Sequence, residues 1–339
     1  MPPDESGGME INMNKNFNKI NTPTTDFEEK LMGVLPWETK EVPSDIPHGD
    51  MPGDKIEIDE SHIAKANVIF PSLAEKLAKK IKENPYQRAV ISVCGGSGVG
   101  KSEIASVLGW FFEQSGIGAY ILSGDNYPHR IPMYNDAERL HIFRESAVRG
   151  MIDAGDYTDD RFKEVRQWQQ EDTDADKSHA EGNAWFESYL AAGRKGLAGY
   201  LGTPNETDFD EVSTIISAFK DGAETLWLKR MGRDAASLWY DEVNVKDKQI
   251  LIIEWTHGNS DFLKGVDIPV LLNSTPAETL AHRRSRNRDG KTDSAFTTMV
   301  LEIEQRKLHD QAHKAGIICA KNGNLISFDE YTELMKDQF

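Results

Sequence analysis

The segment from Ala89 to Ser102 constrains this chain more than any other part of its 339 residues. An apolar, β-branched run from Ala89 to Val93 predicts a buried strand. Apolar residues from Ile104 to Phe112 recur at helical spacing and predict a helix after it. The residues between fit the pattern G-x-x-x-x-G-K-[ST] without a mismatch: Gly95, Gly96, Ser97, Gly98, Val99, Gly100, Lys101 and Ser102. Strand, glycine loop and helix follow one another in the order that a phosphate-binding (Walker A) loop requires.

Each residue type in this loop suits a polyphosphate. A loop without Cβ atoms lets backbone N–H groups approach phosphate oxygens closely. The helix that begins near Lys101 adds unpaired N–H groups and the positive end of its dipole. Lys101 supplies a charge to the β- and γ-phosphates, and the Ser102 hydroxyl is a ligand for Mg²⁺. A glycine turn with an incidental Gly-Lys-Ser is the alternative, but the complete match in the right context favours a nucleoside-triphosphate site, with ATP as the expected nucleotide.

The overall charge excludes one class of partner. Lysine and arginine number 39 against 56 acidic residues, a formal net charge of −17. A non-specific nucleic-acid binder needs a basic face, so no nucleic-acid partner is expected. No apolar run approaches the length of a membrane span, and the first residues lack the features of a signal peptide. Cys94 and Cys319 lie in apolar runs and are interpreted as buried side chains, so a cytoplasmic location without a membrane partner is expected. The sequence leaves a monomer and a homo-oligomer both open.

Strands alternate with helices along most of the chain, which predicts an α/β fold with a mostly parallel sheet and helices on both faces. Residues 1–55 are rich in proline, asparagine and glycine and are interpreted as an irregular N-terminal extension. Residues 56–339 form the predicted P-loop NTPase domain, with a helix expected over 72–83. Within it, residues 131–206 are interpreted as an inserted helical cap with helices near 136–149, 159–171 and 180–198. The acidic run 172–176 is interpreted as a surface segment of this cap.

Two carboxylates follow predicted strands of this sheet. Asp125 comes just after a strand over 119–122, where open parallel sheets place their ligands. A carboxylate there can accept the proton of an attacking hydroxyl or hold a metal-bound water, although an aspartate that caps a turn is the common alternative. Glu254 ends the most apolar strand, 249–253, and is predicted to bind Mg²⁺ or its waters.

The densest basic patch of this acidic chain comprises four arginines between residues 283 and 288. A solvated basic helix end is one interpretation. The planar guanidinium also suits phosphate oxygens, and Arg284 and Arg288 are one helical turn apart, so both can point the same way. We therefore predict that Arg284 and Arg288 cover the phosphates as part of a lid.

Together these residues resemble the P-loop kinases that include uridine kinase, phosphoribulokinase and bacterial-type pantothenate kinase. The resemblance covers about residues 89–130 and 204–321. It rests on the glycine loop and on four further segments that occur in the family's order: Ser123–Tyr127 with its Asp-x-Tyr, Pro204–Asp210 with Phe219–Gly222, Ile252–Glu254, and Arg284–Asp289. Two departures stand out, because Trp255 replaces the family's glycine after the glutamate and about 75 residues are inserted after Arg130.

The resemblance implies an ATP- and Mg²⁺-dependent transferase that phosphorylates a hydroxyl of a small metabolite. Asp125 is then the catalytic base, and Lys101, Arg284 and Arg288 stabilise the charge of the transferred phosphoryl group. The acceptor stays open between a sugar or polyol, a nucleoside and a pantothenate-like alcohol. Its expected contacts are Tyr127, His129, Arg130, Arg144 and His257. A P-loop ATPase or a nucleotide-binding regulator without a small-molecule acceptor is the alternative function; a GTPase is not expected, because the guanine-binding Asn-Lys-x-Asp is missing from the sequence.

Overall fold

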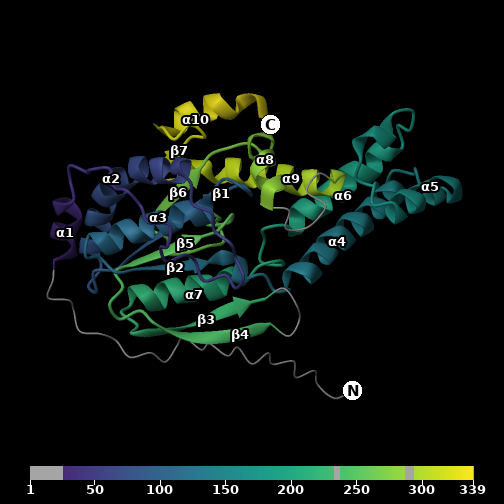
Figure 1. The fold of residues 1–339 in the computed structure, drawn as a ribbon. Coiled ribbons are helices and arrows are strands. Elements are labelled where there is room, and N and C mark those ends of the chain that lie inside the picture. The colour runs from purple at the N-terminus through teal and green to yellow at the C-terminus, as the bar shows by residue number, and fades with distance from the viewer. Residues whose placement is uncertain (1–25, 233–236, 287–293, 339) are drawn as a thin grey trace, which may run out of the picture.

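The structure is a computed structural model, and it describes residues 26–232, 237–286 and 294–338, with only the backbone of 282–286. Its centre is a sheet with the strand order β2-β5-β1-β6-β7-β8 (Figure 1). The strands are β1 (Ala89–Gly95), β2 (Ala119–Ser123), β5 (Ile250–Glu254), β6 (Ile268–Leu272), β7 (Ile317–Cys319) and β8 (Leu325–Ile326). All neighbours pair in parallel except β7 and β8. The α/β fold with a mostly parallel sheet is confirmed.

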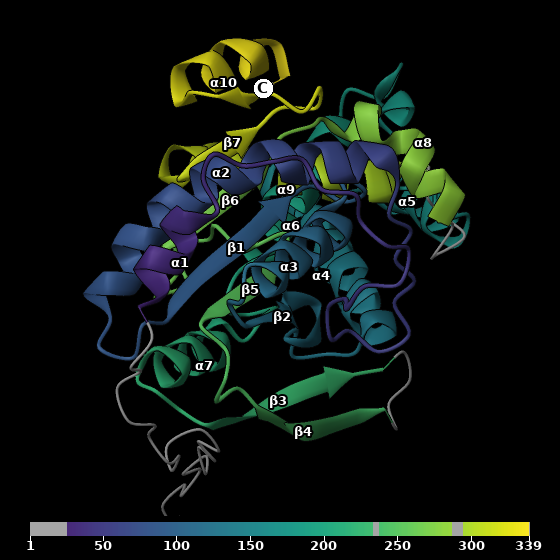
Figure 2. The ribbon, with the colours of Figure 1, turned by 60° about the vertical axis from the view of Figure 1, so that its left-hand side comes forward.

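Helices cover both faces of this sheet, as predicted (Figure 2). Helices α2 (Glu60–Glu83) and α3 (Lys101–Gln114) pack against one face through a core that includes Ile91 and Val93 of β1. Helix α7 (Phe209–Lys220) packs against the other face, together with an antiparallel hairpin of β3 (Thr225–Met231) and β4 (Leu238–Asn244). Successive side chains of β1 point to opposite faces of the sheet, so they contribute to two separate cores. Two further helices, α8 (Pro276–Arg286) and α10 (Phe328–Met335), lie in the C-terminal part of the chain.

Helix α2 begins earlier than the sequence pattern predicts. The expected helix starts after Pro71, whereas the structure has Pro71 inside a helix that begins at Glu60. Asp59 caps its N-terminus by accepting hydrogen bonds from the backbone of Ser61 and His62. Proline inside a helix costs about 3 kcal/mol, but the buried face of α2 offsets this cost by packing on α3.

The segment between residue 26 and α2 lies against the sheet domain. It contains the short helix α1 (Phe27–Gly33), whose Phe27 and Leu31 join the same core as α2 and α3. Trp37 packs on Phe70 and Phe111, with ring centroids 4.4 and 5.0 Å apart. This part of the predicted N-terminal extension is therefore held by apolar burial.

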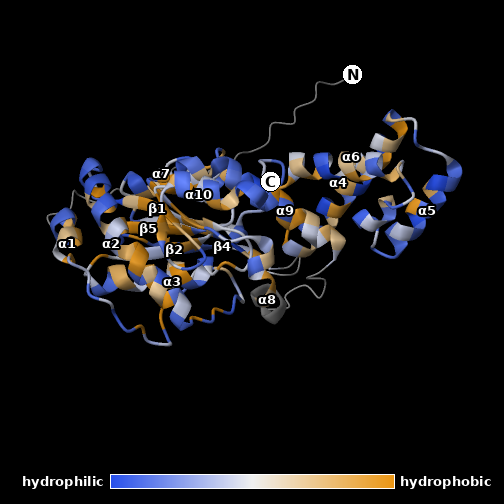
Figure 3. Ribbon diagram, turned by 90° about the horizontal axis from the view of Figure 1, so that it is seen from above, coloured by the Kyte–Doolittle hydropathy of each residue, from blue (hydrophilic) through white to orange (hydrophobic). Residues whose placement is uncertain are grey.

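The inserted region projects from one end of the sheet domain (Figures 1 and 3). Its helices are α4 (Pro132–Asp153), α5 (Asp159–Gln170) and α6 (Phe186–Tyr200), close to the predicted ranges. They enclose a core of their own, built around Phe143, Phe186 and Tyr189. Helix α9 (Ala295–Gln311) joins the two parts, because Met299 and Ile303 pack into this core and Leu308 packs beneath the sheet. Within the described ranges, no helix is long and apolar enough to cross a membrane.

Candidate active site

The glycine loop connects β1 to α3, as the sequence predicts. Gly95 and Gly100 have φ values of 153° and 94°. A Cβ on Gly95 would lie 2.6 Å from the carbonyl oxygen of Leu272, and one on Gly100 would lie 2.7 Å from the His62 ring. The backbone conformation and the close packing of the loop therefore both require glycine at these two positions.

The start of α3 is open to an anion. Gly100 is its N-cap, and no side chain among the described residues caps the first turn. The Lys101 ammonium donates to the carbonyl of Gly96 at 3.3 Å, so its charge stays beside the loop. Unpaired N–H groups, the helix dipole and this lysine together form a site suited to phosphate.

Glu254 lies between the loop and the end of β2. In the sheet register it is opposite Val93 of β1 on one side and Ser123 of β2 on the other. Its carboxylate accepts hydrogen bonds from Ser102 at 3.0 Å and from Ser123 at 2.9 Å. Burial, and secondarily the charge of Asp125, raises the pKa of Glu254 to about 7. A carboxylate and a hydroxyl oxygen this close together are the hard ligands that Mg²⁺ prefers, so these residues fit the ion predicted for Ser102 and Glu254.

Asp125 lies in a short 3₁₀ turn (Gly124–Asn126) directly after β2, and its side chain is exposed. Its charge contributes to the raised pKa of Glu254, so both carboxylates lie in the same electrostatic environment. Gly124 packs beneath the Trp255 indole, and a Cβ there would lie 2.0 Å from the ring. Trp255 is 2% exposed and contacts Phe209 of α7. The tryptophan that departs from the family pattern therefore packs as a core residue against a glycine.

Asp50 is a residue of this region that the sequence analysis missed. Its side chain is 9% exposed and pairs with Arg230 of β3 at 3.0 Å. It also accepts hydrogen bonds from the Ser123 backbone at 2.7 Å, from Tyr120 at 2.9 Å and from the Asn126 amide at 3.2 Å. The N-terminal segment thus binds both ends of the turn that carries Asp125. Asp50 is a single aspartate in a proline-rich segment, and nothing in the sequence around it predicts that it binds this turn.

A second set of polar side chains, the Glu206 cluster, comes from the insertion and from two segments of the sheet domain: Arg139, Glu206, His257 and Glu304. Glu206 accepts hydrogen bonds from Arg139 at 2.5 Å, from Asn135 at 3.0 Å and from the Gly202 backbone at 2.5 Å. The Gly202 turn lies against the His257 ring, because a Cβ on Gly202 would be 2.5 Å from it. Among the four, the sequence analysis named only His257.

This cluster is electrostatically linked to the phosphate-binding loop. Burial lowers the pKa of His257 to about 4, opposed by the charge of Glu206. Burial raises the pKa of Glu304, on which Arg139, Glu206, Lys101 and Asp125 also act. The neighbouring residue of α9, Gln305, has its amide oxygen 3.5 Å from where a Cβ of Gly96 would be. Helix α9 therefore passes beside the loop, through Gln305, and beside the insertion, through Met299 and Ile303.

Three of the expected acceptor contacts lie at the junction of the sheet domain and the insertion. Tyr127 is fully buried in the core between α7 and the sheet, so its side chain has no exposed surface here. His129 is exposed and its ring pairs with the carbonyl of Pro204. Arg130 donates to the Tyr200 hydroxyl at 2.9 Å and approaches Glu138 at 3.4 Å. These residues remain predictions as acceptor contacts.

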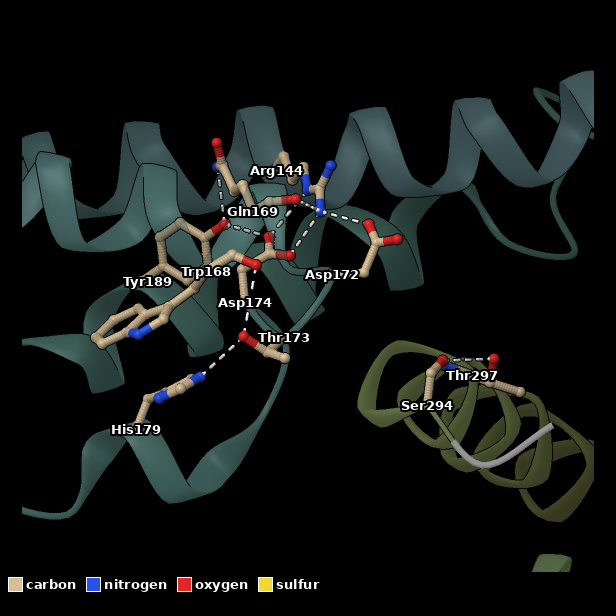
Figure 4. A network of polar contacts seen from close by, with 10 residues as sticks. All are labelled: Arg144, Trp168, Gln169, Asp172, Thr173, Asp174, His179, Tyr189, Ser294 and Thr297. Atoms are coloured by element: carbon tan, nitrogen blue, oxygen red, sulfur yellow. Dashed lines mark hydrogen bonds and ion pairs between the residues drawn. The ribbon is translucent and has the colours of Figure 1, made fainter. Parts of the chain in front are cut away.

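Arg144 belongs to a different network, inside the insertion (Figure 4). It forms a two-pronged ion pair with Asp174, at 3.0 and 2.7 Å, and also binds the carbonyl of Gln169. Tyr189 donates to the same carboxylate at 2.7 Å. Asp174 is 2% exposed, so this part of the acidic run is not a surface segment, contrary to prediction. The observed role of Arg144 is to join α4 to the loop after α5.

The predicted lid arginines fall at the edge of the described chain. Arg284 lies on the backbone of α8, whose bounds are described, but its side chain is outside the described set. Arg288 lies outside the described residues altogether. Their role as a phosphate-covering lid remains a prediction.

Comparison with known proteins gives a clear sequence relative. No family model matches the chain. A bifunctional alpha-galactosidase/sucrose kinase from Mediterraneibacter gnavus is 37% identical over 253 residues, which cover 75% of this chain. The chain is homologous to part of this bifunctional protein. It spans only 22% of that larger protein.

Comparison with solved structures gives two similar chains at low identity. A candidate fructose transport system kinase from Silicibacter sp. TM1040 is 16% identical, with a TM-score of 0.43 over 73% of this chain and 94% of that one. A candidate uridine kinase from Bacillus stearothermophilus is 13% identical, with a TM-score of 0.34 over 73% of this chain and 98% of that one.

Proposed function

We propose that this protein is an ATP- and Mg²⁺-dependent kinase that phosphorylates a hydroxyl of a small sugar. The observation that carries the proposal is the convergence of Lys101, Ser102 and Glu254 with Asp125 at one edge of the sheet. The similarity to a protein described as a sucrose kinase favours a sugar among the acceptors left open by the sequence. Sucrose itself is the first acceptor to test.

The proposed reaction needs positioning and charge more than covalent chemistry by the protein. The glycine loop, the start of α3 and Lys101 hold the β- and γ-phosphates. The acceptor hydroxyl oxygen forms a bond to the γ-phosphorus while the bond from that phosphorus to the β–γ bridging oxygen breaks, and ADP leaves. The hydroxyl proton passes to the carboxylate of Asp125, which is exposed beside the loop. Mg²⁺, when bound by Ser102 and Glu254, neutralises phosphate charge.

The paired serines prepare Glu254 for this role. In the structure Ser102 and Ser123 both donate to its carboxylate, which fixes the direction of its oxygens. A raised pKa means that a bare carboxylate is unfavourable at this buried position, and a divalent cation relieves that cost. We therefore expect nucleotide and Mg²⁺ to bind together.

The test is the release of ADP by the purified protein with a panel of sucrose, fructose, glucose, uridine and pantothenate. The proposal predicts that ADP release depends on a sugar and requires Mg²⁺. ADP release at the same rate with every compound and with none would contradict it and indicate an ATPase. Lys101→Ala is the control for contaminating kinases, because it removes the phosphate-binding charge.

A further inference from the structure

The segment from Gly49 to His62 lies before the residues that resemble the kinase family, yet both of its ends reach the proposed active site. Residues 49–59 form neither a helix nor a strand. At one end Gly49 lies against Glu254, because a Cβ on this glycine would be 3.8 Å from Cγ of the glutamate. At the other end the His62 ring lies against Gly100, 2.7 Å from where a Cβ would be. One stretch of chain therefore contacts both the carboxylate proposed for Mg²⁺ and the phosphate-binding loop.

The order of strands in the sheet separates the phosphate-binding loop from the turn of Asp125. The loop follows β1 and the turn follows β2, and β5 lies between these two strands. Neighbouring strands are about 4.8 Å apart, so the loop and the turn begin roughly 10 Å from each other. His62 comes 12 positions after Asp50, and an extended chain spans roughly 3.3 Å per residue. The segment is therefore long enough to hold both parts of the site at once.

The first end of the segment is bound to the turn through Asp50. Asn126 of the turn is fully buried, and its amide nitrogen donates to the Asp50 carboxylate at 3.2 Å. The amide oxygen of the same asparagine accepts a hydrogen bond from the backbone of Met231 at 3.0 Å. The backbone of Ser123 donates to Asp50 as well, at 2.7 Å. Asp125 lies between Ser123 and Asn126 in the chain, so a shift of Asp50 would move the backbone on both sides of the proposed base.

The second end of the segment is fixed by the first turn of α2. The His62 side chain is buried, and its Nδ1 accepts a hydrogen bond from the backbone N–H of Asp59 at 3.2 Å. The Asp59 carboxylate caps the helix in return, so the two residues form a capping box. The ring cannot turn away from Gly100 without breaking this box. Because Gly100 is the N-cap of α3, the ring supports the point where the unpaired N–H groups of that helix begin.

We infer that residues 49–62 brace the active site, with Asp50 positioning the turn of the proposed base and His62 positioning the phosphate-binding loop. This inference rests on the proposed function, because it names residues that hold the groups of that reaction in place. Both residues act through the backbone that they contact rather than through a contact with substrate. Their loss should therefore have different consequences. Loss of His62 should weaken nucleotide binding, and loss of Asp50 should slow phosphoryl transfer.

The first part of the experiment measures the affinity of the full chain for Mg-ADP by calorimetry. His62→Ala removes the ring that lies against Gly100, and the Kd should rise roughly tenfold because the loop loses this support. His62→Gln retains an acceptor for the Asp59 N–H and most of the buried volume, so its Kd should stay within about threefold of the wild type. His62→Asn, a shorter polar side chain, should show an intermediate loss and replaces the alanine variant if that variant does not fold. Glu330→Ala is the matched control, because Glu330 has the same position in the capping box of α10.

The second part measures kcat with sugar and the hydrogen exchange of backbone amides without ligand. Asp50→Asn keeps the shape of the side chain and removes the charge that pairs with Arg230. We expect kcat to fall by roughly tenfold. The Kd and the stoichiometry for Mg-ADP should not change, which shows that the variant is folded. Amides of residues 123–127 should exchange faster than in the wild type, and those of residues 96–102 should not. Asp45→Asn, at an exposed position before the segment, is the control.

Three results would overturn the inference. The first is wild-type affinity for Mg-ADP in the truncated His62 variants, and the second is an equal loss of affinity in Glu330→Ala. The third is unchanged amide exchange at the turn in Asp50→Asn. A wild type that binds Mg-ADP but phosphorylates no sugar would contradict the proposed function alone, since the affinities and the amide exchange still decide the inference. A wild type that binds no Mg-ADP would overturn both.

Discussion

The proposed phosphate end and the proposed acceptor end of the active site differ in how their polar groups are paired. At the phosphate end, Glu254 is held by two serines and Asp50 by four donors, so the loop and the turn of Asp125 are fixed before any ligand binds. At the acceptor end, His257 and Glu304 have no such partners within the described chain. Preorganisation at the first end favours rate, since charges need not rearrange during the reaction. The two side chains at the second end are partly exposed and lack such constraints among the described residues, so their positions can adjust to a bound acceptor.

The largest effect should come from the proposed base. Asp125→Asn should lower kcat by roughly 10²–10⁴-fold, the usual value of general-base catalysis, while Mg-ATP still binds. Turnover and nucleotide affinity are measured by ADP release and calorimetry. Asp153→Asn, an exposed aspartate of α4, is the control and should change neither. Wild-type turnover in Asp125→Asn would show that another group accepts the proton.

Removing the carboxylate of Asp50, in the N-terminal segment, should affect both the stability of the protein and the reaction rate. Asp50→Ala leaves Arg230 buried without its closest partner, which should lower the free energy of unfolding by about 3 kcal/mol. Because Asp50 also binds the turn of Asp125, kcat should fall by about tenfold, equivalent to 1.4 kcal/mol. Denaturant titration and kinetics measure the two effects. Asp45→Ala, at an exposed position of the same segment, is the control. Equal unfolding free energies and equal kcat values for the two variants would show that Asp50 does not support the turn of Asp125.

The pH dependence of stability should report on Glu254. Its pKa rises from 4.5 in the unfolded chain to about 7 in the fold, so between these values the folded state binds more protons. Stability of the nucleotide-free protein should therefore fall as pH rises from 4.5 to about 7. Glu254→Gln should reduce this slope in thermal melts over that range. An unchanged slope would mean that other groups dominate the titration.

The smallest effect on catalysis should come from Arg144. Arg144→Gln breaks the ion pair with buried Asp174 and should lower the melting temperature, since the carboxylate is left without its cation. Because Arg144 lies in the insertion's own network, the KM values for ATP and for sugar should stay within about twofold at permissive temperature. A rise in the KM for sugar alone would instead indicate that Arg144 contacts the acceptor, as the sequence predicts.

The parts of the molecule that the sequence predicts are those with a local signal. The Walker A loop is contiguous, and apolar runs define β1, β2 and β5, so the sheet and the positions of Lys101, Ser102 and Glu254 follow directly from the sequence. The helices of the insertion also show clear periodicity. Their ranges agree with the structure to within a few residues at most boundaries.

The parts that escape prediction depend on contacts between distant segments. Asp50 binds residues about 70 positions away, and Glu304 is placed by a helix that spans two cores. The β3–β4 hairpin was not anticipated, because β4 alternates little between buried and exposed residues. Tyr127 follows the Asp-x-Tyr pattern, yet tertiary packing turns its ring into the core. No periodicity in a single segment encodes such positions.

The most direct test of the account follows the γ-phosphoryl group itself. ATP labelled with ¹⁸O in that group is incubated with the protein, Mg²⁺ and sucrose, and the products are analysed by mass spectrometry. The account predicts a singly phosphorylated sugar that carries the label, formed together with ADP. Label found only in inorganic phosphate, with sucrose and with every other neutral sugar tested, would contradict it.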